Sequence, residues 1–238
     1  MSILSRILSD ILSVAAPRSC PLCGKMLHGD ESVCSMCEAM APLTMLWREE
    51  ENPMHQRFWG QMPIEKAVSM LWFVDGSVWQ DAVHRFKYKG EWRTAYDLGR
   101  WWGATLRQES LFDDVDMIVP VPLHWRRRLQ RGYNQSEELA LGMAEELDLP
   151  VRSGLVRRSR YNTSQTSQSY SERWDNVEGI FSVSKAMELE GKHILLVDDV
   201  FTTGATIISL GCEILRVVPS ARLSVATLCC SRNAISKG

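Results

Sequence analysis

The chain has 238 residues, of which 45% are hydrophobic and 24% are charged, and its formal net charge is −2. This length allows one well-buried core with a small appendage. The near-neutral charge argues against a protein that coats nucleic acid, although it is compatible with a local basic patch. No stretch approaches the roughly 18 uninterrupted apolar residues of a membrane-spanning helix, so the sequence predicts none.

Residues 1–16 are expected to form a helix with one apolar stripe. The stripe consists of Ile3, Leu4, Ile7, Leu8, Ile11 and Leu12. Its polar side is mostly Ser, which favours packing against the body of the protein or a second copy in a homodimer over binding to a membrane surface. Arg6 and Asp10 interrupt any export signal, and the cysteine count is odd, so we expect a protein of the reducing cytoplasm.

Two CxxC motifs follow, with ten residues between them. Their thiols are those of Cys20, Cys23, Cys34 and Cys37. Two such pairs complete a tetrahedral zinc site, and four thiolates leave no open position, so the predicted zinc is structural. His28 lies in the intervening loop, either as a solvated side chain or as a substitute ligand. The other cysteines, Cys212, Cys229 and Cys230, are expected to be core thiols.

Residues 38–108 predict a connector, a strand and two helices. Residues 38–63 are irregular, 67–74 are apolar enough for a strand, and 78–88 and 94–108 have helical periodicity. Six of the aromatic residues here are candidates for base stacking, namely Trp72, Trp79, Phe86, Trp92, Trp101 and Trp102. Their spacing favours core packing over base stacking, with one or two left to line a pocket. The basic segment 87–90 is expected to be solvated or to lie at the rim of a pocket.

A second buried strand is predicted over residues 116–121, and its end is rich in proline. The segment that follows contains Arg126, Arg127, Arg128 and Arg131. Guanidinium groups pair with phosphate oxygens in a fork, so this segment is either an anion-binding loop or a solvated basic helix start. A helix is predicted up to residue 147, and a further strand over 150–158.

The segment 193–206, HILLVDDVFTTGAT, is the most informative part of the sequence. The apolar run 194–197 is typical of a strand buried on both faces. Asp198 and Asp199 come next, where the strand is expected to reach the edge of its sheet. A turn of small residues then leads into a predicted helix over 207–218, and a last strand is predicted over 222–230. The turn consists of Thr202, Thr203, Gly204, Ala205 and Thr206.

A strand, a small-residue turn and a helix start together favour phosphate binding, because backbone N–H groups and the helix dipole attract anions. Gly204 allows the backbone to come close to such a ligand. Asp198 and Asp199 would repel phosphate but suit hydroxyl groups beside it. A ribose 5-phosphate has both features. The alternative is an ordinary strand-to-helix junction, but paired acids at a strand end have no packing function.

The segment LLVDDVFTTGAT resembles the signature with which type I phosphoribosyltransferases bind 5-phosphoribosyl 1-pyrophosphate (PRPP). Together with the four cysteines, KYKG, VPVPLHWRRRLQRGYNQ and ERWDNV, it is similar to the ComF family over nearly the whole chain from Cys20. The resemblance implies an α/β fold with a central, mainly parallel sheet. The expected parts are an N-terminal helix and zinc ribbon (1–45), a connector and hood-like segment (46–110), and the phosphoribosyltransferase-like core (111–238).

The resemblance also implies roles for particular residues. Asp198 and Asp199 would be catalytic and hold the ribose hydroxyls, while the turn 202–206 would hold the 5-phosphate. The loop after the first core strand would bind pyrophosphate with its Mg²⁺. Its residues are Pro122, Leu123, His124, Arg126 and Arg128. A loop over 159–177 would close over the reactants, with Arg173 as its best cation, because the KGR-type lysine of orotate enzymes is missing.

Two functions follow from this resemblance. The first is transfer of phosphoribosyl from PRPP to an unidentified nucleophile, with release of pyrophosphate. The family is associated with DNA uptake in competence. In the second, the PRPP pocket is a sensor or scaffold, while the zinc ribbon and Arg126–Arg131 contact a protein of the competence machinery or single-stranded DNA. The two differ in turnover and in whether DNA affinity falls steeply with salt.

Overall fold

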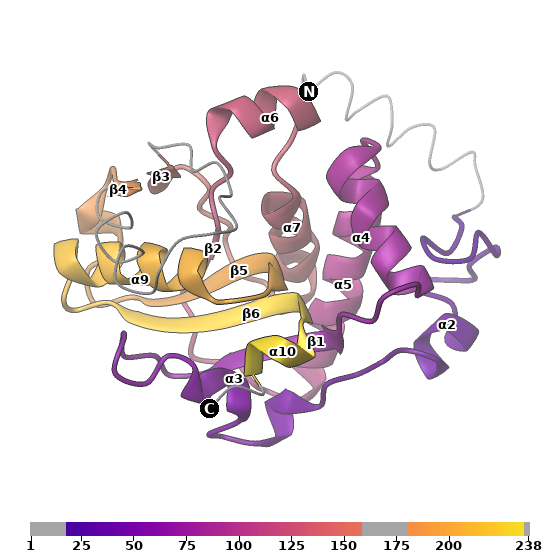
Figure 1. Ribbon diagram of the computed structural model, residues 1–238, viewed down its shortest axis with the longest axis horizontal. Coiled ribbons are helices and arrows are strands. Elements are labelled where there is room, and N and C mark those ends of the chain that lie inside the picture. The colour runs from indigo at the N-terminus through magenta and orange to yellow at the C-terminus, as the bar shows by residue number, and fades with distance from the viewer. Residues whose placement is uncertain (1–17, 159–179, 236–238) are drawn as a thin grey trace.

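The computed structural model of the protein describes residues 18–158 and 180–235 (Figure 1). The helix expected over 1–16 and the loop expected over 159–177, with Arg173, lie outside the described residues. Of the helices within the described ranges, none combines the length and the apolar character needed to cross a membrane.

A four-stranded parallel sheet forms the centre of the molecule, in the order β1-β6-β5-β2. Its strands are β1 (Ala67–Trp72), β2 (Met117–Pro120), β5 (His193–Phe201) and β6 (Arg222–Cys230). Helices cover both faces, which explains why these strands have continuous apolar runs. The sequence predicted all four strands, and the α/β fold with a central parallel sheet is confirmed.

Alternate residues of the central strands enter two separate cores. Leu195 and Val197 pack towards α4, α5, α7 and the cysteine segment. Ile194 and Leu196 pack towards α3 and α9 on the other face. The helices are α2 (Ser35–Ala39), α3 (Pro53–Gln56), α4 (Val78–Tyr88), α5 (Trp92–Gln108), α6 (Trp125–Arg131), α7 (Gln135–Leu147), α9 (Ala205–Val217) and α10 (Arg232–Ile235), with short 3-10 turns at Leu46–Arg48 and Ala186–Glu188.

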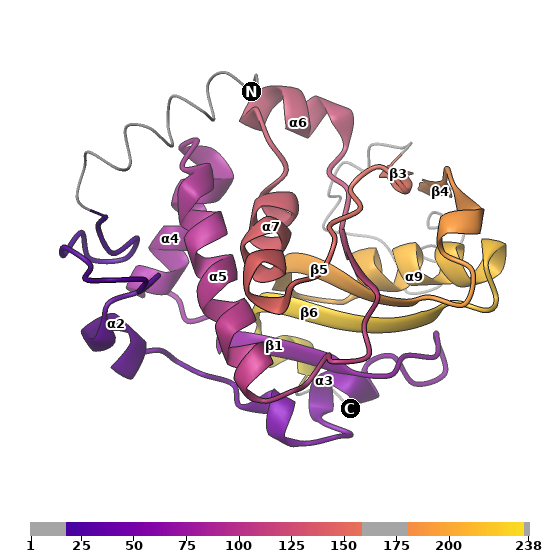
Figure 2. The ribbon, with the colours of Figure 1, turned by 180° about the vertical axis from the view of Figure 1, so that it is seen from behind.

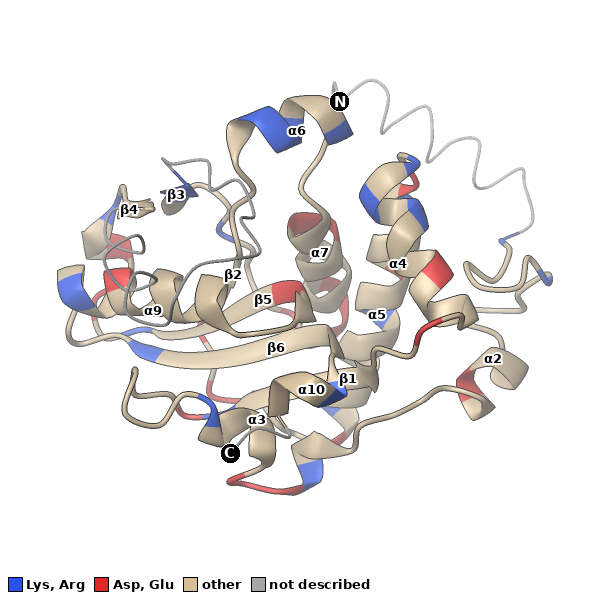
Figure 3. Cartoon of the chain, in the orientation of Figure 1, with Lys and Arg blue, Asp and Glu red and all other residues tan. Residues whose placement is uncertain are grey.

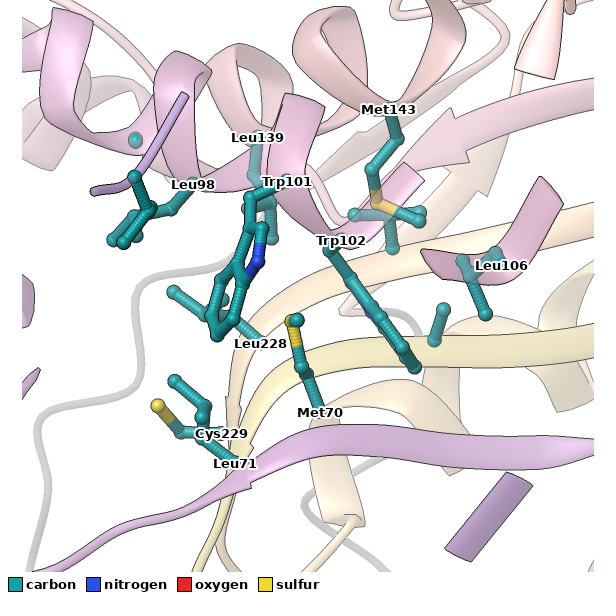
Figure 4. Close-up of a cluster of buried hydrophobic side chains, with 14 of the residues drawn as sticks. Met70, Leu71, Leu98, Trp101, Trp102, Leu106, Leu139, Met143, Leu228 and Cys229 are labelled. Atoms are coloured by element: carbon teal, nitrogen blue, oxygen red, sulfur yellow. The ribbon is translucent and has the colours of Figure 1, made fainter. Parts of the chain in front are cut away.

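Most of the aromatic residues are core residues, as predicted. Trp101 and Trp102 lie between α7 and the strands, against Met70 and Met143 (Figure 4). The ring of Trp79 stacks on that of Trp101 with centroids 5.0 Å apart. Phe86 is also buried, whereas Trp72 and Trp92 are partly exposed.

Two segments differ from the expectation. Of residues 150–158 only β3 (Val156–Arg158) is a strand, and it pairs antiparallel with β4 (Phe181–Val183) in a separate two-stranded sheet. Strand β1 belongs to the expected hood-like segment, yet it is an edge strand of the central sheet, paired with β6. The central sheet therefore includes chain from both sides of the boundary expected at residue 110, and the three-part division stays a prediction.

Helices α5 and α7 run side by side across one face of the sheet (Figure 2). Glycines allow their backbones to approach closely. A Cβ added to Gly142 would lie 2.7 Å from the backbone nitrogen of Arg100, and one added to Gly103 would lie 2.8 Å from the carbonyl oxygen of Met143. This packing fixes the start of α7, which contributes to the site described below.

We expect Gly142→Ala to lower the free energy of unfolding by about 1–3 kcal/mol or more, because the new methyl group meets backbone that cannot move aside. Without that contact, the higher helix propensity of alanine would stabilise the protein by about 1 kcal/mol. Gly154→Ala is the matched control, since a Cβ there meets nothing within 4 Å. Urea unfolding of the two variants checks the prediction, and equal stabilities would contradict it.

Candidate functional site

The acid pair lies on β5 where the neighbouring strand has already ended. Strand β2 stops at Pro120, which is paired with Val197, whereas β5 continues to Phe201 along β6. From the sequence we expected Asp198 and Asp199 to follow the strand. The structure places both of them inside it. Pairing with β6 extends the strand beyond the end of β2.

Asp198 is partly buried and has two donors of its own. The hydroxyl of Ser136, at the start of α7, donates a hydrogen bond of 2.8 Å to Asp198 Oδ1. The backbone N–H of Asp199 donates to the same oxygen at 2.9 Å. Burial and the neighbouring Asp199 charge nevertheless raise the pKa of Asp198 to about 7.

Asp199 is paired with a lysine that is distant in the sequence. It is only 5% exposed, and Lys87 at the end of α4 places its ammonium 3.1 Å from Asp199 Oδ1. Of the two positions expected for segment 87–90, solvation is wrong for Lys87, whose side chain is 19% exposed. The position at a pocket agrees with the structure, because Lys87 lines the cavity described below. A buried carboxylate needs such a partner. The second oxygen, Oδ2, is buried without a hydrogen-bond partner among the described residues.

The raised pKa of Asp198 has a consequence for stability. Between its ordinary value of 3.8 and about 7, the folded state binds more protons than the unfolded state, so stability falls as the pH rises through this window. Asp198→Asn removes the effect. We expect it to increase the free energy of unfolding more at about pH 8 than at about pH 5, each relative to the unchanged protein.

Urea unfolding at the two pH values measures this difference. Asp148→Asn is the matched control, because it removes an acid at the opposite end of α7, and Asn tolerates the positive φ of 55° found there. The same gain at both pH values would contradict a raised pKa.

The motif Tyr133–Ser136 joins three elements around the acids, and the sequence analysis treated it only as a helix start. The Tyr133 hydroxyl donates to the carbonyl oxygen of Phe86 in α4, and Asn134 Nδ2 donates to Val121 O at 3.0 Å. Ser136 reaches Asp198, as described. The side-chain oxygens of Asn134 and Gln135 are buried without partners in the described part of the chain. The run of four polar residues at the start of a buried helix was the signal in the sequence that this segment contributes to the site.

The small-residue turn leads directly from β5 into α9. Gly204 is the N-cap of the helix with a φ of 77°, and an added Cβ would lie 2.8 Å from the Phe201 ring, so only glycine fits. Ala205 and Thr206 belong to the first turn of α9 and not to the preceding turn. Thr202 and Thr203 are exposed. The N–H groups at the start of this 13-residue helix are available to an anion.

The loop after β2 is followed by the short helix α6. His124 caps this helix by accepting a hydrogen bond from the Arg126 N–H at 3.2 Å. Desolvation and the positive charges of the nearby arginines lower the pKa of His124. Pro122 and Leu123 are half-buried. Arg126 and Arg128 are exposed, and Arg128 lies 3.5 Å from Glu137 on α7.

Arg158 is a further cation near the acids that sequence reasoning missed. It lies at the end of β3, over the ring of Phe181. Burial lowers the pKa of its guanidinium, Arg127 acts in the same direction, and Asp198 acts in the opposite direction. Arg158 is therefore close enough to Arg127 and to Asp198 for both charges to act on it. Figure 3 shows basic residues on α6 and at the end of α4, with acids at the end of β5.

A cavity of about 560 Å³ adjoins the acid pair on the side of α4. It is lined by Phe73, Asp75, Val83, His84, Lys87, Tyr88, Val200, Thr202, Ser231, Arg232 and Asn233. These residues come from α4, from the end of β5 and from the segments that follow β1 and β6. Lys87 and Thr202 link the cavity to the acids and to the small-residue turn.

The four predicted metal ligands are together in the structure. Their sulfur atoms all lie within 4.8 Å of one another, with Cys23 Sγ and Cys34 Sγ 3.6 Å apart. Sulfur atoms bound tetrahedrally to one zinc at about 2.3 Å would be about 3.8 Å apart. Although burial acts in the opposite direction, backbone hydrogen bonds from Cys34, Cys23 and Leu22 lower the pKa of Cys20 to about 7, as suits a thiolate ligand. The cluster is therefore compatible with a structural zinc, and His28 is not part of it.

The cysteine segment packs on α4 and α5. Cys34 and Cys37 belong to the same core as Trp101, and Trp101 Nε1 donates to Glu38 Oε1 at 3.0 Å. Arg85 of α4 donates to the carbonyl oxygen of Pro21. The cysteine segment thus supports the helix that carries Lys87.

Comparison with known proteins agrees with this geometry. The family model for the phosphoribosyl transferase domain matches residues 134–237. The DNA utilization protein YhgH of Salmonella typhi is 35% identical over 207 residues, covering 83% of this chain and 84% of the relative. Competence protein ComFC of Bacillus subtilis (strain 168) is 30% identical over 189 residues, covering 79% of this chain and 68% of the relative.

Other matches are shorter. Competence protein F of Haemophilus influenzae is 30% identical over 129 residues, which cover 52% of this chain and 56% of that protein. This chain therefore spans little more than half the length of that relative. Among solved structures, the allosteric regulatory enzyme of purine biosynthesis aligns with a TM-score of 0.39 and 23% identity, over 56% of this chain and 25% of its own. A score this low adds nothing to the sequence matches.

The parallel sheet, the acid pair on β5 and the small-residue turn before α9 define a type I phosphoribosyltransferase fold. Within that class, the chain belongs to the ComF family.

Proposed function

We propose that the protein binds PRPP with Mg²⁺ and transfers its phosphoribosyl group to a nucleophile. The observation that carries this proposal is the position of Asp198 and Asp199 directly before the Gly204 turn and the start of α9. The proposed phosphate site at that turn therefore adjoins the proposed ribose site at the acids, just as the 5-phosphate adjoins the ribose in PRPP.

The residues then have distinct roles. The N–H groups and hydroxyls of the turn 202–206 hold the 5-phosphate. Asp198 and Asp199 accept hydrogen bonds from the ribose hydroxyls, and their negative charge stabilises the positive charge that develops on the ring. Arg158 and the loop from Pro122 to Arg128 are placed to attract the pyrophosphate. Arg173 remains a proposed cation of the loop over 159–177.

Magnesium would neutralise pyrophosphate as it leaves. The bond between the anomeric carbon and the pyrophosphate oxygen breaks, and its electron pair leaves with pyrophosphate. The nucleophile supplies a lone pair to the same carbon and loses its proton to solvent.

Calorimetric titration with PRPP and MgCl₂ tests the proposal. We expect saturable binding, and weaker binding of ribose 5-phosphate, which lacks the pyrophosphate. Absence of PRPP binding by folded protein with its zinc would overturn the proposal. Release of pyrophosphate in the presence of a nucleophile would separate an enzyme from a sensor or scaffold that binds PRPP without turnover.

For the cysteine cluster we propose one structural zinc, held by all four thiolates. Free thiols stay available to zinc in the reducing cytoplasm, which is where we propose that the protein works. A homodimer through the stripe in residues 1–16 stays a prediction.

A second candidate function is contact with single-stranded DNA in competence, for which the exposed surface of α6 supplies the observation. Arg126 lies over the ring of Trp125 at 5.3 Å, and Arg131 lies over that of Tyr88 at 5.1 Å. Trp125 is 57% exposed and Tyr88 71% exposed. Exposed rings beside arginines form a surface on which unpaired bases can stack. The names of the relatives, competence protein and DNA utilization protein, agree with this candidate.

We expect Trp125→Ala to weaken binding of a single-stranded oligonucleotide by about 10-fold, the loss of one stacked base. Trp59→Ala is the matched control, because Trp59 is equally exposed but lies beyond α3 on the other side of the sheet. Fluorescence anisotropy at several salt concentrations measures both variants. An affinity that does not fall with salt, or an equal loss in both variants, would contradict the candidate.

A further inference from the structure

We infer that the cavity beside the acid pair is the acceptor site, and that it takes a nitrogen nucleophile carrying a carboxylate. The inference rests on the proposed function and names the substrate class of the same site. It depends on where the cavity lies, on its cations and on the pairing of Lys87.

The cavity is next to the expected position of the reacting carbon. Thr202 belongs both to its lining and to the turn proposed to hold the 5-phosphate. Lys87 lines it too, and contacts Asp199, which is proposed to hold a ribose hydroxyl. A molecule in the cavity would therefore lie beside the ribose. The cavity volume of about 560 Å³ is sufficient for a small organic ligand.

Arg232 lines the wall of this cavity. Its guanidinium carbon lies 4.7 Å from the centroid of the Trp72 ring. This cation–π contact does not use the N–H groups of the guanidinium, with which arginine binds a carboxylate in a fork. Within residues 18–158 and 180–235, no carboxylate is recorded within ion-pair distance of Arg232. The acid of the lining, Asp75, accepts a hydrogen bond from Gln80 at 2.8 Å.

Lys87 supplies a second cation once PRPP is bound. When ribose hydroxyls donate to Asp199, the ammonium of Lys87 shares with the ligand the one ion-pair partner it has among the described residues. A largely buried ammonium that loses part of its pairing needs another anion. The cavity gives it access to one. Binding of PRPP is therefore expected to strengthen binding of a carboxylate in the cavity.

In the reaction, the nitrogen lone pair of this acceptor forms the bond to the anomeric carbon of PRPP. The bond from that carbon to the pyrophosphate oxygen breaks, and pyrophosphate leaves with the electron pair. An acceptor nitrogen that carries a proton then loses it to solvent, whereas a pyridine nitrogen has no proton to lose and keeps the positive charge. The carboxylate stays unchanged on Arg232 and Lys87 and fixes the orientation of the nucleophile.

Calorimetry with three probes tests the inference: 2-aminobenzoate, pyridine-2,3-dicarboxylate and orotate, each compared with its carboxamide. The protein is first saturated with ribose 5-phosphate, pyrophosphate and Mg²⁺, which occupy the PRPP site without turnover. We expect at least one carboxylate to bind about 10-fold or more tightly than its carboxamide. Arg232→Gln should abolish this preference. Arg216→Gln, on the exposed side of α9 and paired with Glu213, should retain it.

The outcomes separate this inference from the function on which it rests. PRPP binding with no preference for any carboxylate overturns the acceptor class and leaves the proposed function intact. A preference that survives in Arg232→Gln overturns the assignment to this cavity. Absence of PRPP binding overturns both.

Discussion

The Asp198→Asn/Asp199→Asn variant is expected to bind PRPP with Mg²⁺ about 100-fold more weakly than the unchanged protein, or not at all. Each carboxylate would accept a charge-assisted hydrogen bond from the ribose, and losing one such bond costs about 1.5–3 kcal/mol. The loss of two such bonds at one site therefore lowers the affinity for PRPP by about 100-fold or more. Calorimetric titration measures the affinity directly.

Asp199→Asn leaves the ammonium of Lys87 without its carboxylate partner, so the folding of the double variant is checked by urea unfolding. Asp198→Asn alone relieves repulsion and should be at least as stable as the unchanged protein near neutral pH, in line with the raised pKa of Asp198. Asp148→Asn controls for the loss of an acid outside the site and should bind PRPP normally. Affinity within about twofold of the unchanged protein would show that the acids do not hold the ribose.

Loss of zinc is expected to have the largest effect on stability. Zinc binding contributes about 10–16 kcal/mol to the folding of isolated zinc-finger peptides. Cys34→Ser removes one of four ligands that lie within 4.8 Å of one another, so we expect it to lose zinc and to be destabilised by several kcal/mol. Metal content and urea unfolding measure the two effects, with one zinc per chain expected in the unchanged protein.

Loss of zinc should also weaken binding of PRPP. Cys34 and Cys37 share a core with Trp101, and Arg85 of α4 contacts the same segment. Disorder there would loosen the helix that places Lys87 beside Asp199, so PRPP affinity should also fall. Cys212→Ser is the matched control, since this thiol lies outside the cluster and is half-buried on α9. Full zinc content in Cys34→Ser would contradict the four-thiolate site.

The short, contiguous features of this protein were determined by the sequence. The apolar run before Asp198 is a buried strand, and the small-residue turn does lead into α9 through Gly204. The spacing of the cysteines predicted four sulfur atoms around one point. These features depend on residues close together in the chain, because strand burial, turn conformation and knuckle geometry are local properties.

The partners of the acids were decided only by the tertiary structure. Lys87, Ser136 and Arg158 lie far from Asp198 and Asp199 in the chain. The polar run 133–136 is a local signal for Ser136, but no local pattern distinguishes Lys87 or Arg158 from solvated residues. The packing of α4, α5 and α7 on one face of the sheet places Lys87 and Ser136 at the end of β5. The acids are buried there, and a buried charge is stable only beside a partner, so the arrangement of the helices determines which residues complete the site.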